Sequence, residues 1–247
     1  MNIRIDEEAG LRALRFEGDG DAIQSLIDPL QPQRLVMENL QYLMSLLLFI
    51  PPPQRILLLG VGAGALLHFL RHHYPHSRIT GVDNDAALIE HAQQELGLPR
   101  ADARLDYAIT DARDFLADGT DRFDLIVTDI FTGPQSPPWV ISGEFIRAVQ
   151  QRLSPTGAAG WNLLIGGRRS FEHYYRGLRR CFRQQTLCLE HEDHENLLAM
   201  GFNFEVKPLP MEQRLRQAAE LGARLELPLT DALAAIYRIN PVGQGVI

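Results

Sequence analysis

The spacing of apolar and polar positions changes near residue 54, and this change predicts two units along the chain. Before it, Ile3-Arg-Ile5 and Leu11–Phe16 alternate like two short strands. A broad apolar face then predicts a helix from Pro32 to Phe49, which Pro51-Pro52-Pro53 ends because proline lacks the backbone donor that a helix needs. We therefore expect residues 1–50 to form a small N-terminal β unit with one helix.

After residue 54, apolar runs suited to strands alternate with amphipathic runs suited to helices. Arg55–Leu59 is apolar after its first residue, which is typical of a central parallel strand covered on both faces. The predicted strands are 55–59, 78–82, 105–109, 123–128 and 160–164, and the predicted helices are 65–73, 86–96, 144–153 and a short stretch around Phe115. This order is typical of an α/β fold with a doubly wound, mostly parallel, Rossmann-like sheet.

The last part of the chain predicts a helix, an antiparallel hairpin and two further helices. The helices are expected over 171–181, 211–225 and 230–239, and the two strands of the hairpin over 184–189 and 196–202. Between these strands lies the polar loop 191–195, which we expect to be an exposed tip. We assign residues 54–247 to one Rossmann-like domain.

Charge and composition narrow the classes of function. The chain has 247 residues and a formal net charge of −7, which disfavours a general binder of nucleic-acid phosphates. Its longest apolar run is too short to span a membrane, and its acidic, polar N-terminus is unlike a secretory signal, so we expect a cytoplasmic protein. Cys181 and Cys188 have no metal-binding spacing and are expected to be reduced, and no metal site is predicted.

Three glycines mark the turn between the first strand of the predicted sheet and the helix that follows it. Gly60, Gly62 and Gly64 allow a tight turn and let a ligand approach the backbone beside the partly positive helix N-terminus. Their GxGxG spacing differs from the GxGxxG pattern that holds a dinucleotide pyrophosphate. We therefore predict a nucleoside-binding turn, with close packing between strand and helix as the alternative.

Aspartates end the next three strands of the predicted sheet. Asp83, Asp111 and Asp129 would meet at its carboxyl edge, where open α/β sheets bind their ligands. We expect Asp83 to accept the ribose hydroxyls, and Asp111 with the backbone N–H of Ala112 to contact adenine. Helix capping is the alternative for both, and Asp85 is a better candidate for a cap than Asp83. Asp129 is expected to face the crevice as the catalytic carboxylate.

The run from Gln54 to Leu164 resembles the S-adenosylmethionine-dependent methyltransferase fold and, within it, the spermidine synthase-like family. Ile23-Gln24-Ser25 is similar to the family's Ile-Gln segment, whose glutamine contacts the nucleoside, and Glu38-Asn-Leu40 is similar to its Glu-Met-Leu. The resemblance implies a polyamine-type transferase that uses S-adenosylmethionine or its decarboxylated form. The product of the cofactor would be S-adenosylhomocysteine or methylthioadenosine, and Gln24 would take part in binding the cofactor.

The chain departs from the family where polyamine synthases hold their amine. Ala63 stands where the family has an aspartate, Thr132 replaces the last aspartate of its Asp-Ser-Ser-Asp loop, and Val36 replaces a tyrosine. Because a diamine carries two charges, each buried ammonium needs a partner. These replacements predict poor transfer to putrescine unless another carboxylate reaches the pocket.

The acceptor is expected to be a small molecule, and two alternatives to aminopropyl transfer stay open. One is a small-molecule methyltransferase on the same scaffold, and the other is a nucleoside-binding dimer without catalysis. If residues 1–50 form a β unit as in the resembled family, their exposed strand edges need cover. We therefore expect a homodimer in which these residues help to form the contact.

Overall fold

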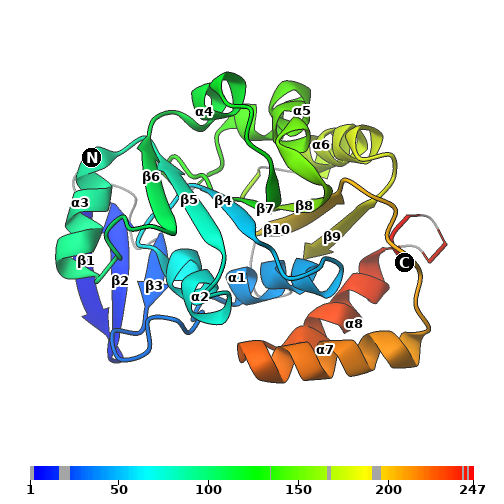
Figure 1. The fold of residues 1–247 in the computed structure, drawn as a ribbon, viewed down its shortest axis with the longest axis horizontal. Coiled ribbons are helices and arrows are strands. Elements are labelled where there is room, and N and C mark those ends of the chain that lie inside the picture. The colour runs from blue at the N-terminus through cyan, green and yellow to red at the C-terminus, as the bar shows by residue number, and fades with distance from the viewer. Residues whose placement is uncertain are drawn as a thin grey trace.

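The computed structural model describes residues 3–16, 23–133, 135–165, 168–190, 196–240, 242–243 and 245–247, whose strands form two sheets (Figure 1). The small N-terminal sheet is antiparallel and has the order β1-β2-β3. Its strands are β1 (Ile3–Glu8), β2 (Leu11–Phe16) and β3 (Ser25–Ile27). The two N-terminal strands predicted from alternation are confirmed. The three-residue β3 was not predicted, because its sequence Ser-Leu-Ile does not alternate between apolar and polar residues.

The large sheet has seven strands in the order β6-β5-β4-β7-β8-β10-β9. Its strands are β4 (Arg55–Leu59), β5 (Arg78–Asp83), β6 (Leu105–Ile109), β7 (Phe123–Thr128), β8 (Leu153–Leu163), β9 (Thr186–Glu190) and β10 (Leu197–Phe202). The strands from β6 to β8 pair in parallel, and β10 pairs antiparallel with both β8 and β9. The doubly wound Rossmann-like fold with a C-terminal antiparallel hairpin is therefore confirmed.

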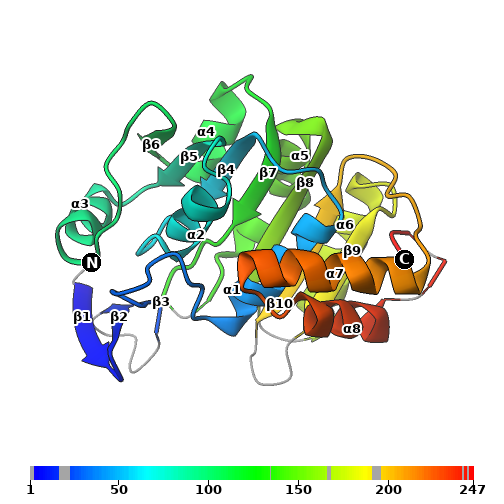
Figure 2. The same ribbon diagram turned by 60° about the horizontal axis from the view of Figure 1, so that its bottom comes forward.

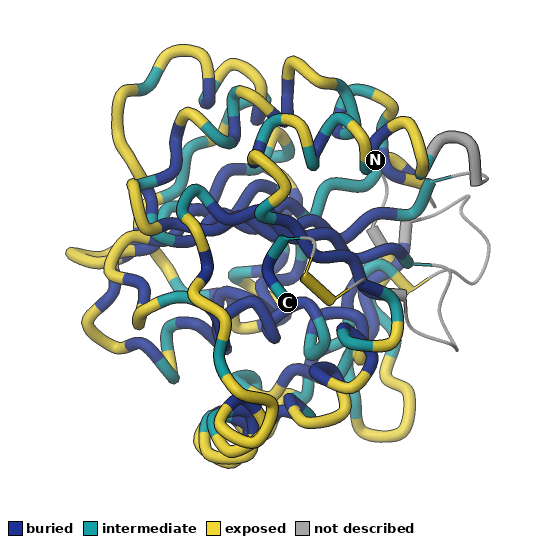
Figure 3. The backbone as a smooth tube through the Cα atoms, turned by 90° about the vertical axis from the view of Figure 1, so that its right-hand side faces the viewer, coloured by how far each residue is buried: buried dark blue, intermediate teal, exposed yellow. Residues whose placement is uncertain are grey.

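Helices cover both faces of this sheet (Figures 1 and 2). One face carries α4 (Ala112–Asp118), α5 (Gly143–Gln151) and α6 (Arg168–Cys181). The other carries α1 (Glu38–Leu43), α2 (Ala65–His73), α3 (Ala86–Glu95), α7 (Met211–Leu225) and α8 (Leu229–Ile239). The direction of winding reverses at β4, because α2 and α3 lead outward to β5 and β6 while α4 leads back to β7. Figure 3 shows the buried strands between these two helical layers.

Two sequence predictions are wrong in part. Residues 32–37 are not helical: α1 begins at Glu38 and continues as a 3-10 helix over Met44–Leu48. Leu35 is buried without being helical, so the apolar spacing there reports burial and not conformation. The strand predicted over 160–164 starts earlier, at Leu153, because its first residues pair with β7 through a register shift.

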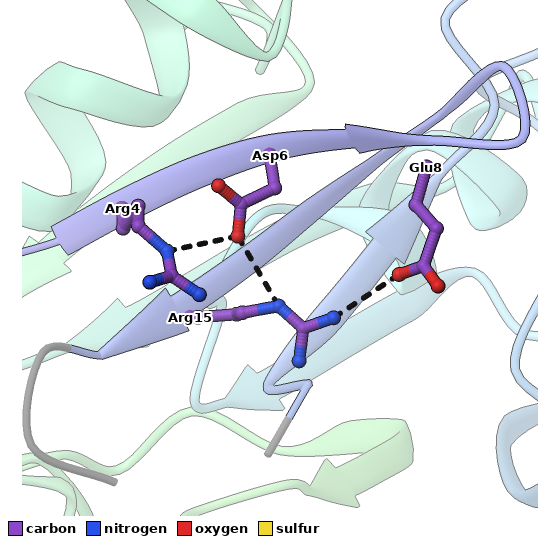
Figure 4. A network of polar contacts seen from close by, with 4 residues as sticks. All are labelled: Arg4, Asp6, Glu8 and Arg15. Carbon is purple, nitrogen blue, oxygen red and sulfur yellow. Dashed lines mark hydrogen bonds and ion pairs between the residues drawn. The ribbon is translucent and has the colours of Figure 1, made fainter. Parts of the chain in front are cut away.

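The N-terminal sheet presents one apolar face and one polar face. Leu14 and Ile27 belong to the same hydrophobic cluster as the large sheet, so the apolar face is buried against it. On the polar face, Arg15 bridges Asp6 at 3.3 Å and Glu8 at 3.1 Å (Figure 4). The division into an N-terminal domain and a Rossmann-like domain stays a prediction, since the two units share one core.

The remaining elements agree with the sequence in kind and nearly in length. No helix among the described residues is long and apolar enough to cross a lipid bilayer. The loop 191–195, expected to be an exposed tip, lies outside the described residues.

Candidate functional site

A cavity of about 600 Å³ opens at the carboxyl ends of the parallel strands, where β4 meets β5 on one side and β7 on the other. This is the edge at which the winding reverses and at which open α/β sheets bind their ligands. Of the residues predicted to bind a ligand, the following line the cavity: Gln24, Gly60, Gly62, Asp83, Asp111, Ala112 and Asp129. The N-terminal unit closes one wall with Leu14, Gln24, Ser25 and Leu40.

The glycine turn after β4 needs its glycines for two different reasons. Gly60 has a φ of +87°, and a Cβ on it would overlap the backbone carbonyl of Asp129, which directly follows the neighbouring strand β7. Gly64 has a φ of +90° and precedes α2, and a Cβ there would overlap the Leu98 side chain. Gly64 does not border the cavity, so its contribution is to packing, whereas Gly60 and Gly62 face the open space.

Asp83 organises this turn from the end of β5. Its Oδ2 accepts hydrogen bonds from the backbone N–H of Val61 at 2.9 Å and of Gly62 at 3.4 Å. Its Oδ1 accepts from the N–H of Asp85 at 3.1 Å. The cap of α3 is Asp85, which accepts from the N–H of Leu88 at 3.0 Å. The ribose contact stays a prediction, and holding the glycine turn is a role that the sequence did not reveal.

Asp111 and Arg113, at the start of α4, form an ion pair in the lining of the cavity. Asp111 caps α4 by accepting from the backbone N–H of Arg113 at 2.8 Å, so the capping alternative holds. The Arg113 guanidinium donates to the same carboxylate at 2.7 Å and holds the pKa of Asp111 below its usual range. This guanidinium also lies over the Trp139 ring, 4.7 Å from its centre. The adenine contact of Asp111 and Ala112 stays a prediction.

Asp129 follows β7 and takes part in a short row of side-chain hydrogen bonds. Its Oδ1 accepts from Asn162 Nδ2 at 2.8 Å, and Asn162 Oδ1 accepts from Asn196 Nδ2 at 2.9 Å. No described residue donates a hydrogen bond to Asp129 Oδ2. Burial raises the pKa of Asp129 from 3.8 to about 6, against the smaller opposite effect of the Asn162 hydrogen bond. A carboxyl with a pKa near 6, open to a cavity, is suited to proton transfer near neutral pH.

Hydrogen bonds connect the loop after Asp129 to the N-terminal unit and to the residues that follow β8. Gln24 Nε2 donates to the carbonyl of Gly133 at 3.3 Å, which joins the N-terminal sheet to this loop across the cavity. Ser136 exchanges hydrogen bonds with Leu164 at 3.0 Å, beyond the end of β8. The predicted contact of Gln24 with a nucleoside stays a prediction, and its observed partner is the loop. Pro134 lies outside the described residues.

The positions that depart from the resembled family lie differently with respect to the cavity. Thr132 is exposed and borders it, next to Phe131. Ala63 is buried, and neither it nor Val36 is among the described residues that line the cavity. The charged side chains of the described lining are Asp83, Asp85, Asp111, Asp129 and Arg113. Since Arg113 is paired with Asp111, the lining carries an excess of negative charge.

Asn162 is the functional candidate that the sequence reasoning missed. It is the single polar side chain in the otherwise apolar end of β8, and it is 3% exposed. A signal was available, because Asn162 is a polar residue in the otherwise apolar run of the predicted strand 160–164, close to the edge where Asp83, Asp111 and Asp129 were identified. Within the described ranges, no group of three His, Cys, Asp or Glu side chains could hold a metal ion.

Comparison with known proteins gives a consistent result. A family described as "Methyltransferase domain" matches residues 56–157. A polyamine aminopropyltransferase of Neisseria meningitidis is 26% identical over 240 residues, covering 97% of this chain and 90% of the relative.

Two solved structures have the same fold. A probable spermidine synthase from Corynebacterium glutamicum superposes with a TM-score of 0.73 at 22% identity, covering 98% of this chain and 94% of that one. Human methyltransferase-like protein 13, in complex with SAH, superposes with a TM-score of 0.69 at 24% identity, covering 78% of this chain and 94% of that one.

Proposed function

We propose that the cavity binds S-adenosylmethionine or its decarboxylated form, because the chain is a spermidine synthase-like transferase with the class I methyltransferase fold. We also propose that Asp129 orients the acceptor and takes its proton. The observation that carries this proposal is the placement of Asp83, Asp111 and Asp129 around one cavity at the carboxyl edge of the sheet. The relatives named for aminopropyl transfer support the class of reaction.

The residues of the cavity fit an adenosyl group. At Gly62 a Cβ would point into open space, so a ligand can approach the backbone there. The volume of about 600 Å³ is within the range of small-molecule sites. The excess of aspartates in the wall favours a cationic ligand such as a sulfonium. When bound, this cofactor supplies an alkyl carbon that the positive sulfur makes electrophilic.

Asp129 is the residue that contacts the acceptor. Above a pH of about 6 it is ionised, and its Oδ2 can accept a hydrogen bond from an amine nucleophile. This contact directs the nitrogen lone pair at the electrophilic carbon, so that positioning lowers the barrier. The cofactor would supply the electrophilic carbon and carry the leaving sulfur away as a neutral thioether, and Asp129 would take the proton that the amine nitrogen loses.

The acceptor end of the cavity suits one ammonium better than two. Asp129 is followed there by Phe131 and Thr132, neither of which can neutralise a charge. An ammonium buried without a partner costs several kcal/mol, and each 1.4 kcal/mol is a factor of ten in affinity. Putrescine is therefore a poor acceptor.

The first prediction is adenosyl-ligand binding with little or no spermidine synthesis. Calorimetry with methylthioadenosine and S-adenosylhomocysteine measures binding. Incubation with the decarboxylated cofactor and putrescine, followed by chromatography for spermidine and methylthioadenosine, measures transfer. If neither nucleoside binds, the cofactor assignment is contradicted. Robust spermidine formation that disappears in Asp129→Asn shows that another carboxylate completes the amine site, and it contradicts the poor-acceptor proposal.

Methyl transfer is the second candidate, and the uncharged side chains of Phe131 and Thr132 beside Asp129 favour it. Because neither side chain can pair with a second ammonium, this part of the cavity suits an acceptor with a single amine group, which a methyltransferase can use. The two reactions differ in the nucleoside that they release. With amine acceptors and S-adenosylmethionine, accumulation of S-adenosylhomocysteine identifies methyl transfer, and methylthioadenosine from the decarboxylated cofactor identifies aminopropyl transfer.

A further inference from the structure

Three adjacent strands align a row of polar side chains across the carboxyl edge of the sheet. The last pair in the register of β7 and β8 is Thr128 with Trp161, so Asp129 and Asn162 follow as neighbours. Asn196 immediately precedes β10, the strand on the other side of β8. The row therefore begins at Asp129, which lines the cavity, and continues to Asn162 and Asn196, which are not among the described lining residues.

All the hydrogen bonds of this row are donated toward Asp129. An ionised carboxylate can only accept, so Asp129 fixes the orientation in which Asn162 presents its NH₂ group. The amide oxygen of Asn162 then faces the other way, where Asn196 donates to it at 2.9 Å. The NH₂ group and the amide oxygen of Asn162 therefore each have a hydrogen-bond partner.

A packing role does not explain Asn162. Its neighbours in β8, Trp161 and Leu163, are fully buried, and Asn162 itself is 3% exposed. A buried amide must find partners for donor and acceptor alike, whereas an apolar side chain of similar size has no such requirement. The position of the amide is therefore explained by the carboxylate that it contacts.

We propose that Asn162, held in place by Asn196, is a positioning residue for Asp129. Asn162 fixes Oδ1 and the plane of the carboxylate, so that Oδ2 is directed at the acceptor nitrogen. The role of Asp129 toward an acceptor rests on the proposed function. The arrangement of Asp129, Asn162 and Asn196 does not depend on that function, so it can be tested in protein without any ligand.

The hydrogen bond from Asn162 also affects the ionisation of Asp129. Burial raises the pKa of Asp129 to about 6, and the Asn162 bond opposes this because it stabilises the charged form. Removal of the bond therefore moves the pKa of Asp129 further upward. The other charged groups that line the cavity are Asp83 at the end of β5, Asp85 after it, and Asp111 and Arg113 at the start of α4.

The test is an NMR titration of the Asp129 carboxyl carbon in ligand-free protein. In Asn162→Leu the midpoint should lie above that of the wild type, and in Asn196→Leu it should move in the same direction by a smaller amount. Asn240→Leu is the matched control, since Asn240 is also a buried amide with hydrogen bonds but binds the backbone of Cys188. It should lower thermal stability without moving the Asp129 midpoint. Should Asn162→Leu fail to fold, Asn196→Leu carries the test.

The rate of transfer and its pH dependence provide a second test once an acceptor has been identified. In Asn162→Leu we expect kcat at pH 7 to fall roughly tenfold or more, with cofactor affinity unchanged and the acidic limb of the pH profile moved upward. A folded Asn162→Leu with an unchanged Asp129 midpoint and an unchanged pH profile would show a merely structural residue and overturn the proposal. A wild type that binds no adenosyl ligand contradicts the proposed function, while the titration still tests the positioning role.

Discussion

At the scale of single residues, Asp129 combines a functional position with an energetic cost. Its pKa rises from 3.8 to about 6 on folding, so the folded state disfavours the ionised carboxylate. Below about pH 4 the Asp129 carboxyl is mostly protonated in both the folded and the unfolded protein, so it costs the folded state no stability. The cost grows as the pH rises from about 4 to about 6, and above that it is complete. Active sites commonly keep such groups at the expense of stability.

The corresponding prediction is that Asp129→Asn stabilises the protein at alkaline pH. A shift of about two pKa units corresponds to about 3 kcal/mol of unfolding free energy at pH 8, and the gain should fall below about 1 kcal/mol at pH 4. Urea denaturation at the two pH values measures it. Asp118→Asn, which changes an exposed carboxylate in the same way, is the control for the substitution itself. An equal gain at both pH values for Asp129→Asn would contradict the elevated pKa.

At the scale of elements, the unit formed by β4, its glycine turn and α2 is held by a residue from the next strand. Asp83 closes β5 and accepts from the N–H groups of Val61 and Gly62. The carboxylate and the turn therefore form one structure. A ligand that contacts either one depends on both.

We predict that Asp83→Ala weakens binding of methylthioadenosine by about 1.5–3 kcal/mol, the scale of a hydrogen bond to a charged group. Calorimetry measures the affinity, and thermal denaturation shows whether the variant is folded. Ser142→Ala is a matched control, because Ser142 also accepts from a backbone N–H, at 3.1 Å, but caps α5 away from the cavity lining. It should lower stability and leave affinity unchanged. Unchanged affinity in folded Asp83→Ala would remove the ribose assignment.

At the scale of the whole molecule, the strand edges differ in how they are covered. The outer edge of β9 is covered by Asn240, whose side chain accepts from the backbone N–H of Cys188 at 2.9 Å and donates to its carbonyl at 2.7 Å. These bonds imitate a neighbouring strand. The outer edge of β1 pairs with no strand of the described chain. Unpaired edges invite association with another chain, unless charged side chains such as Glu7 prevent it.

We therefore predict a homodimer in which the N-terminal sheet helps to form the contact. Light scattering at tens of micromolar protein should give twice the chain mass of 27.8 kDa. Since Arg4, Asp6, Glu8 and Arg15 form ion pairs on the polar face of this sheet, the measurement should be made at low and high salt. A monomer under both conditions would count against the prediction.

The sequence by itself determined the order of the strands and α-helices after residue 54, the parallel sheet and the aspartates at its carboxyl edge. These follow from local rules: a buried parallel strand is apolar throughout, and its first polar residue marks the edge. Asp83, Asp111 and Asp129 all line the cavity because a strand end is visible in the sequence. The same rule would have identified Asn162.

Only the tertiary structure decided what each of these side chains contacts. The hydrogen bond of Gln24 to Gly133 joins residues 109 positions apart, and that of Asn162 to Asp129 joins residues 33 positions apart. Such partners depend on the order of strands in the sheet, which no local pattern specifies. The same limit explains the error at residues 32–37, where Leu35 is buried by packing without being helical. Burial determines apolar spacing, and backbone conformation is then settled by the neighbours that provide the burial.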